Sequence, residues 1–133
     1  MTRTLETKLQ IADWDEKPYR ELPDGRRFTR AEVRLTGSAG EGLAAGAFEA
    51  LMYYRADGTG TYVTLMSLDA TLDGRAGGIV LQGEGTYDGT TAQIRYRVVE
   101  ATGELAGLTG SGTSRSTHAD YPYLPLALDY DLG

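Results

Sequence analysis

The feature that most constrains the fold is a series of short runs of alternating apolar and polar residues, separated by Asp-Gly dipeptides. Asp-Gly stands at 24–25, 57–58, 73–74 and 88–89. This dipeptide favours tight hairpin turns, so the runs on either side are expected to pair as antiparallel strands. The predicted strand runs are residues 4–14, 27–37, 42–58, 59–74, 77–89, 91–101, 110–118 and 124–132.

The alternation has the period of two that places every second side chain on one face of a strand. Ala31, Val33 and Leu35 interleave with Glu32 and Arg34. The runs 91–101 and 124–132 repeat this pattern. Such strands bury one face and expose the other to water.

These runs fill most of the chain, so the predicted fold class is all-β. We expect a closed up-and-down antiparallel β-barrel of about eight strands, in a single domain over residues 1–133, because closure removes the unpaired edges of a long meander. Residues 102–112 are the exception, since Leu105 and Leu108 lie three apart and predict one short helical turn beneath a barrel end. An open sandwich is the alternative architecture. A barrel of this size is filled by side chains or holds one small ligand.

Charge and composition exclude several functions. The formal charge is −6, with 13 Lys and Arg against 19 Asp and Glu, and the basic residues are scattered. A nucleic-acid interface needs a basic stripe that neutralises phosphates, so none is expected. With no cysteine and a single histidine, His118, which is interpreted as a loop residue, no metal site is predicted. The sequence has neither a secretory signal nor a membrane-length apolar run, which predicts a cytoplasmic protein without membrane association.

Residues 42–54 carry apolar side chains on both faces of the predicted strand. Phe48 and Met52 lie on one face, and Leu51 and Tyr53 on the other. One face is expected to line the barrel interior and the other to meet the helical turn or a second subunit. Because large exposed apolar bands are uncommon on monomers, a homodimer is predicted.

Glu49 interrupts the second of these faces, which it shares with Leu51 and Tyr53. If that face lines the interior, burial would favour the neutral carboxyl, which can give or take a proton. Glu49 and Tyr53 are therefore the candidate catalytic residues. Two alternatives remain open: Glu49 pairs with an arginine such as Arg34 or Arg97, or its face points outward into water.

Trp14, the only tryptophan, stands among the carboxylates of Asp13, Asp15 and Glu16. The favoured interpretation is a structural plug at a barrel end, with Pro18 ending the strand, because tryptophan is mostly a large buried residue. The alternative places Trp14 at the barrel mouth as a lid, beside Asp15 and Glu16 as an acid/base pair.

Polar and aromatic side chains in other runs are candidate ligand contacts. Gln82 and Glu84 share one face, where they could orient a carbonyl or supply a second carboxyl, although this alternation equally suits a solvent face. Strand tyrosines combine an apolar ring with a hydroxyl, as small-molecule pockets do. The predicted ligand-binding residues are Trp14, Met52, Tyr62, Gln82, Glu84, Tyr96 and Tyr130.

Five segments together resemble a bacterial family of domains of unknown function. They are WDEKPY at 14–19, YYRADGTGTYV at 53–63, GGIVLQGEGTYDG at 77–89, GELAGLTGSG at 103–112 and ALDYDL at 127–132. The resemblance implies a closed eight-stranded barrel similar in fold to allene oxide cyclase, and often dimeric. Enzymes of that wider barrel class work without a metal or a cofactor, which implies no cofactor here. The family supplies no catalytic residues.

Three functions fit these expectations. The first is a cofactor-independent cyclase or isomerase that folds a small, largely apolar metabolite of natural-product type inside the barrel, with Glu49 handling the proton. The alternative is a non-catalytic, lipocalin-like binder of a small lipophilic ligand. A third possibility is an interaction protein whose interior is filled by side chains. The fold alone does not choose among them.

Overall fold

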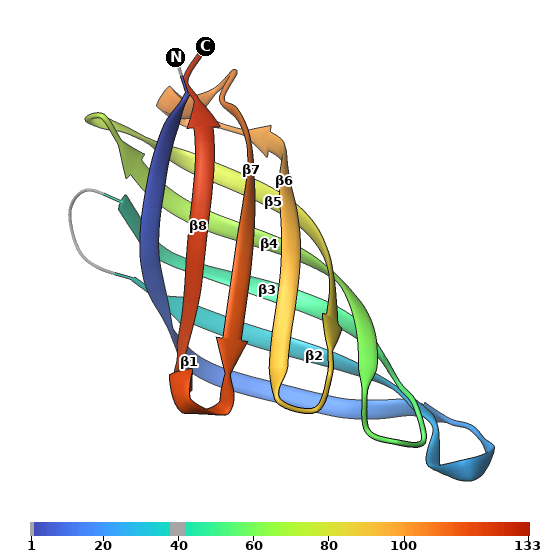
Figure 1. Ribbon diagram of the computed structural model, residues 1–133. Coiled ribbons are helices and arrows are strands. Elements are labelled where there is room, and N and C mark those ends of the chain that lie inside the picture. Colours follow the sequence, from blue (N-terminus) through green and yellow to red (C-terminus); the bar gives the residue numbers. More distant parts are fainter. Residues whose placement is uncertain (1, 38–41) are drawn as a thin grey trace.

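The computed structural model describes residues 2–37 and 42–133. Over these residues eight antiparallel strands follow one another around the sheet, and β8 returns to β1 to close a barrel (Figure 1). The strands are β1 (Arg3–Glu21), β2 (Arg27–Thr36), β3 (Gly42–Tyr54), β4 (Gly60–Leu72), β5 (Arg75–Tyr87), β6 (Thr91–Ala101), β7 (Thr109–Thr117) and β8 (Tyr123–Asp131). Single 3-10 turns are η1 (Pro23–Gly25), η2 (Gly103–Leu105) and η3 (His118–Asp120). The predicted closed meander is confirmed. No helix within the described ranges is long and apolar enough to cross a membrane.

The strand β1 closes the barrel by changing partner part-way along its length. Its first part pairs with β8 from Arg3 to Gln10, and its second part pairs with β2 from Gln10 to Glu21. Register shifts after Ile11 and after Pro18 bend the strand. The strand thus continues through Pro18, where the sequence predicted its end. Proline is tolerated here because this part of β1 has a ladder partner on one side only.

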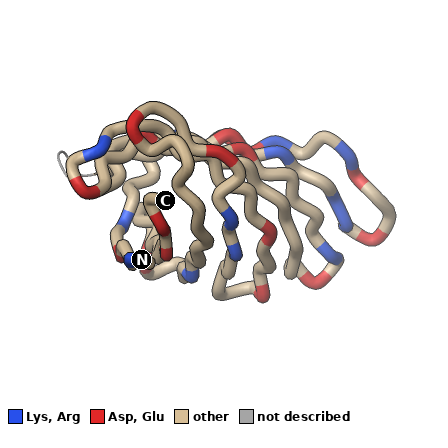
Figure 2. Tube along the Cα trace, turned by 90° about the horizontal axis from the view of Figure 1, so that it is seen from above, with Lys and Arg blue, Asp and Glu red and all other residues tan. Residues whose placement is uncertain are grey.

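Inward-facing aliphatic side chains fill most of the barrel interior. As predicted, Ala31, Val33 and Leu35 of β2 face inward, whereas Glu32 and Arg34 face water. Charged residues of both signs are interspersed over the strands (Figure 2). The largest fully buried side chains are Leu9, Val33, Leu43, Met66, Leu68, Leu72, Ile79, Leu81, Leu105 and Leu128. Their removal from water, at about 1.5–3 kcal/mol for each large side chain, is the main force that holds the barrel together.

The turn η2 covers the barrel end at which the N- and C-termini lie (Figure 1). Leu105 and Leu108 are both buried there. The Thr102 N–H donates to the carbonyl of Gly78 over 2.9 Å. Gly77 permits this close approach, because a Cβ at that position would collide with the carbonyl of Thr102. The predicted helical turn with two leucines beneath a barrel end is confirmed.

The outer surface of β3 and β4 carries an apolar patch. Leu51, Val63 and Leu65 are 49%, 53% and 58% exposed, and Leu51 lies opposite Val63 in the β3–β4 register. We call these three residues the outer patch. The interior face of β3 is therefore the one that carries Phe48 and Met52.

Candidate ligand-binding site

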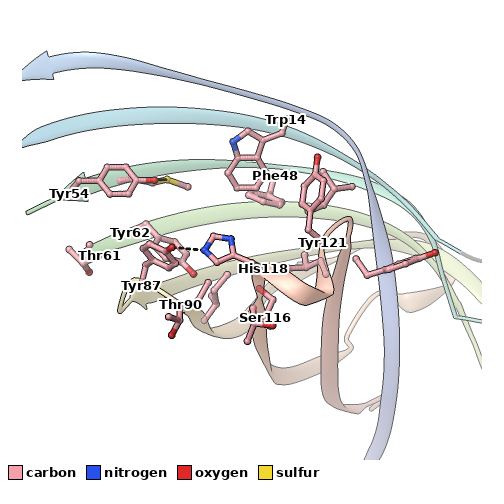
Figure 3. A pocket seen from close by; sticks show the side chains of 18 of the residues that line it. Trp14, Phe48, Tyr54, Thr61, Tyr62, Tyr87, Thr90, Ser116, His118 and Tyr121 are labelled. Carbon is pink, nitrogen blue, oxygen red and sulfur yellow. Dashed lines mark hydrogen bonds between the residues drawn. The ribbon is translucent and has the colours of Figure 1, made fainter. Parts of the chain in front are cut away.

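A pocket of about 610 Å³ opens at the barrel end opposite η2, where η3 lies near the bend of β1 (Figures 1 and 3). We call it the mouth pocket. Its walls are mainly aromatic and aliphatic, with a few hydroxyl groups and one imidazole. The lining residues are Ile11, Trp14, Phe48, Met52, Tyr53, Tyr54, Gly60, Thr61, Tyr62, Tyr87, Thr90, Ala92, Ile94, Ser116, Thr117, His118, Tyr121, Tyr123 and Leu124.

Two glycines of β5 make room for two tyrosine rings on the wall of the barrel. A Cβ at Gly85 would lie 2.8 Å from the ring of Tyr62, and a Cβ at Gly83 would lie 2.7 Å from the ring of Tyr96. Both rings therefore pack directly against the backbone of β5. Burial raises the pKa of both phenols, so each stays protonated at neutral pH.

The carboxylate of Glu16 organises one side of the mouth pocket. The register of β1 places Glu16 opposite the inward-facing Ala31. The carboxylate accepts hydrogen bonds from the hydroxyl of Thr29 at 2.8 Å, the phenol of Tyr54 at 3.0 Å and the indole N–H of Trp14 at 3.1 Å. Such charge-assisted bonds are stronger than bonds between neutral groups, so Glu16 fixes two aromatic side chains of the wall.

Tyr54 is a hydrogen-bond donor that this carboxylate has already engaged. Burial first, and the negative charge of Glu16 second, raise the pKa of Tyr54 to about 12. The phenol oxygen also lies 3.2 Å from the sulfur of Met52, which is a weaker acceptor than a carboxylate. The proton of Tyr54 therefore points to Glu16.

Trp14 forms part of the pocket wall. Its ring packs edge-to-face on Phe48, with ring centroids 6.0 Å apart and an interplanar angle of 81°. The side chain is 40% exposed, so the prediction of a buried structural plug is wrong. The reason is that β1 continues beyond the end of β8, which leaves Trp14 with a strand partner on one side only.

His118 lies at the rim, at the first residue of η3. The carboxylate of Asp120 accepts hydrogen bonds from the backbone N–H and the hydroxyl of Thr117, at 2.7 and 3.2 Å, which holds the turn in place. The phenol of Tyr87 donates to the carbonyl of Gly89 at 2.8 Å and lies 2.9 Å from Nε2 of His118. Figure 3 shows the imidazole reaching from η3 towards Tyr87, with Phe48 and Trp14 nearby.

The side chains that line the mouth pocket are of the kinds that contact an organic ligand. Among the described residues, no group of three or more His, Cys, Asp or Glu side chains could hold a metal ion. The pocket instead offers ring faces, phenols and one imidazole, which recognise apolar and aromatic surfaces with a few hydrogen bonds.

Comparison with known proteins places the chain in a family. A family model described as "Protein of unknown function (DUF3224)" matches residues 5–130. The chain belongs to the DUF3224 family. The crystal structure of a DUF3224 protein of unknown function from Shewanella oneidensis has the same fold, with a TM-score of 0.76 and 24% identity over 98% of each chain. Comparison with curated proteins found no match. The predicted membership of a family of unknown function is confirmed, and the likeness to allene oxide cyclase stays a prediction.

The predicted ligand-binding residues of this DUF3224 chain separate into three groups. Trp14, Met52 and Tyr62 line the mouth pocket. Tyr96 is buried over Gly83, outside the lining, and Tyr130 is buried opposite Arg3, near the other barrel end. Gln82 and Glu84 face outward, because the buried positions of β5 are Leu81, Gly83 and Gly85. The placement of Gln82 and Glu84 in the lumen is wrong.

The placement of Glu49 in the lumen is also wrong. Phe48, Ala50 and Met52 face the interior, so Glu49 between them faces water, and its side chain is 59% exposed. Its carboxylate pairs with Arg30 at 2.9 Å, rather than with Arg34 or Arg97. Glu49 therefore has no access to the pocket.

Tyr53 occupies an intermediate position. It reaches the rim of the mouth pocket, although it belongs to the outward-facing set of β3. Its ring packs on that of Phe28, with centroids 5.1 Å apart. Tyr53 could therefore contact a ligand only at the rim of the mouth pocket.

Sequence reasoning missed the residues that organise the pocket. The sequence predicts a loop residue at His118, and it does not identify Tyr54 or Tyr87 as pocket residues. One signal was available: Thr117 and Asp120 have the spacing of a capping box, which marks a structured turn in place of a loose loop.

Proposed function

We propose that this DUF3224 chain binds one small, largely apolar and planar molecule in the mouth pocket. The observation that carries the proposal is a space of about 610 Å³ walled by aromatic side chains at one end of an otherwise filled barrel. This volume lies within the range of about 300–1,000 Å³ that is usual for small-molecule sites.

Fixed aromatic walls favour binding because they need little ordering when a ligand arrives. Glu16 already holds Trp14 and Tyr54, and the Trp14 ring rests on Phe48. An immobilised side chain otherwise costs about 0.5–1.5 kcal/mol on binding, so a preorganised wall leaves more of the contact energy as affinity.

The test uses the fluorescent apolar amine N-phenyl-1-naphthylamine as a probe. Two substitutions are matched: Ala92→Phe fills part of the pocket lining, and Ala47→Phe adds the same ring on the exposed face of β3. The wild type and Ala47→Phe are expected to bind the probe. Ala92→Phe is expected to weaken binding by at least about fivefold, or about 1 kcal/mol, since the added ring occupies part of the space that the probe needs. The proposal fails if the wild type does not bind, or if both variants bind equally well.

A second candidate is a cofactor-independent isomerase or cyclase acting on the same class of molecule. It is favoured by one observation: an imidazole and a phenol, His118 and Tyr54, line the same pocket and could move or steer a proton. Glu49 does not support this candidate. Incubation with a lipophilic bacterial extract, followed by chromatography and mass spectrometry, separates the two functions. An isobaric product at a new retention time indicates catalysis, and a compound retained unchanged indicates a binder.

The outer patch supports a homodimer as the state in which the chain works. Its apolar centre is flanked by Arg30 and Glu49, so the surface carries both signs of charge. In a dimer with a twofold axis, the apolar centre of each chain would pack against the same centre of the other chain. Each Arg30 would then lie near a carboxylate of the other chain, because an isologous interface uses the same patch on both subunits.

A further inference from the structure

We infer that His118 accepts a hydrogen bond from the ligand through Nδ1, so the mouth pocket selects planar aromatic molecules that carry an uncharged hydrogen-bond donor, such as a phenol hydroxyl. The inference rests on the proposed ligand-binding function and specifies the ligand class.

The single proton of the Tyr87 phenol determines which nitrogen of His118 is protonated. The carbonyl oxygen of Gly89 is an acceptor only, and it takes this proton at 2.8 Å. The phenol oxygen can then only accept from Nε2 of His118, 2.9 Å away. The proton of the neutral imidazole therefore resides on Nε2, and Nδ1 carries a free lone pair.

The imidazole ring of His118 is held in position by the turn η3 and by Tyr87. The capping interaction between Thr117 and Asp120 holds η3, and the rings of His118 and Tyr87 meet at 88° with centroids 6.2 Å apart. His118 lines the mouth pocket together with Phe48 and Trp14, and its imidazole reaches from η3 towards Tyr87 (Figure 3). The His118 side chain is exposed at the rim, and within the part of the chain that the structure describes no other group makes a hydrogen bond with Nδ1, so this nitrogen is open to a ligand.

The other polar groups of the lining are either engaged or able to play both roles. Tyr54 and Trp14 donate to Glu16, and the Thr61 hydroxyl donates to the carbonyl of Gly85. The hydroxyls of Thr90 and Thr117 donate to Asp88 and Asp120. The remaining hydroxyls can donate or accept and therefore do not discriminate; they belong to Tyr53, Tyr62, Ser116, Tyr121 and Tyr123. The group with a fixed, unused role is Nδ1 of His118, an acceptor, so the ligand that satisfies it must bring a donor.

Charge disfavours a donor that is carried on an anionic group. Glu16 lies directly behind Trp14 and Tyr54, and the chain carries a net charge of −6. An anionic head group would be repelled by this field. A phenol or naphthol hydroxyl meets the requirement, and its ring matches the aromatic walls.

The test compares two probes by equilibrium dialysis: 2-naphthol, which has a donor, and 2-methoxynaphthalene, which has the same ring system without one. The measured quantity is the ratio of the two affinities, compared between proteins so that the different hydrophobicity of the probes cancels. His118→Phe keeps a planar ring and removes the acceptor. It is expected to lower the preference for 2-naphthol by about two- to tenfold, the usual net value of one hydrogen bond. The control Tyr19→Phe alters an exposed tyrosine outside the lining and is expected to keep the wild-type ratio.

Nitrogen-15 NMR of the single histidine tests the proton assignment independently, at a pH at which the imidazole is neutral. Nε2 is expected to give the signal of a protonated ring nitrogen and Nδ1 that of a nitrogen with a lone pair, and the reverse pattern overturns the assignment. If the wild type binds both probes and His118→Phe leaves the ratio unchanged, the inference is wrong while the proposed function stands. If the wild type binds N-phenyl-1-naphthylamine but neither naphthalene probe, the inference is likewise wrong while the proposed function stands. If it binds none of the three probes, the proposed function itself is wrong.

Discussion

The phenol oxygen of Tyr54 lies 3.0 Å from the carboxylate of Glu16, and the hydroxyl of Thr29 donates to the same carboxylate oxygen at 2.8 Å. These residues belong to three neighbouring strands, β3, β1 and β2. One carboxylate therefore ties the strands together at the rim and keeps the aromatic wall of the mouth pocket in position.

Glu16→Gln should lower the pKa of Tyr54 to a value between 10.0 and about 12. The negative charge of Glu16 opposes ionisation of the phenol, whereas burial, the larger cause of the raised pKa, remains in the variant. A pH titration of tyrosines labelled at the ζ carbon, followed by NMR, gives the value, with Tyr54→Phe to assign the signal. Glu21→Gln, at an exposed position, serves as the control. An unchanged pKa in Glu16→Gln would show that the carboxylate does not contact the phenol in solution.

Stability should decline in alkali once the pH exceeds about 10. Burial raises the pKa of Tyr54, Tyr62 and Tyr96 above the ordinary value of 10.0, so the folded chain holds these protons more tightly than the unfolded chain does. Their contribution is complete below pH 10 and is lost as the pH rises through the raised pKa values, which begin at about 12 for Tyr54. Urea denaturation followed by circular dichroism at about pH 8 and about pH 11 measures the loss. Equal free energies of unfolding at both pH values would contradict the burial of these phenols.

Gly83→Ala should destabilise the barrel by about 1–3 kcal/mol, the usual cost of overpacking. The added methyl group would lie 2.7 Å from the ring of Tyr96 and 2.9 Å from the hydroxyl of Thr64. Gln82→Ala changes the neighbouring, exposed position of the same strand and should stay within about 0.5 kcal/mol of the wild type. Urea denaturation of both variants provides the comparison, and equal stabilities would mean that the ring of Tyr96 does not pack against β5.

Leu65→Glu should convert a dimer to a monomer if the outer patch is the contact between two copies. The substitution places a charge in an apolar centre that would be buried by its own copy. Thr113→Glu, at an exposed position of β7, carries the same change in charge away from the patch. Sedimentation velocity of the three proteins at equal concentration gives the oligomeric state. A monomeric wild type, or a dimeric Leu65→Glu, excludes this interface.

The fold could be predicted because its determinants are local. Asp-Gly turns and alternation around Ala31, Val33 and Leu35 fix strands, hairpins and faces without knowledge of distant partners. Strand β3 is different, since both of its faces are apolar and the pattern does not say which one points inward. The pairing register of β3 with β2 and β4 decides which face points inward. In this register Glu49 lies on the outer surface, where it pairs with Arg30.

The mouth pocket could not be predicted because it depends on residues far apart in the sequence. Tyr87 and His118 are separated by 31 positions and Glu16 and Tyr54 by 38, and nothing in the local pattern brings either pair together. The bend of β1 is equally important for the position of Trp14, because it places this side chain in the pocket wall and not in the barrel end. The bend results from register shifts between β1 and β2, which the sequence of β1 alone does not indicate.

The pairing of β1 with β8 also has a consequence for how the chain acquires its pocket. Arg3 lies opposite Tyr130, so this seam joins the first of the eight strands to be synthesised with the last of the eight. Contacts of such long sequence separation form slowly, because the chain must first lose the entropy of closing a very large loop. The mouth pocket, whose lining extends from Ile11 to Leu124, is complete only once this seam has formed. A nascent chain that has not yet released β8 from the ribosome would therefore have most of its hairpins but no place for a ligand.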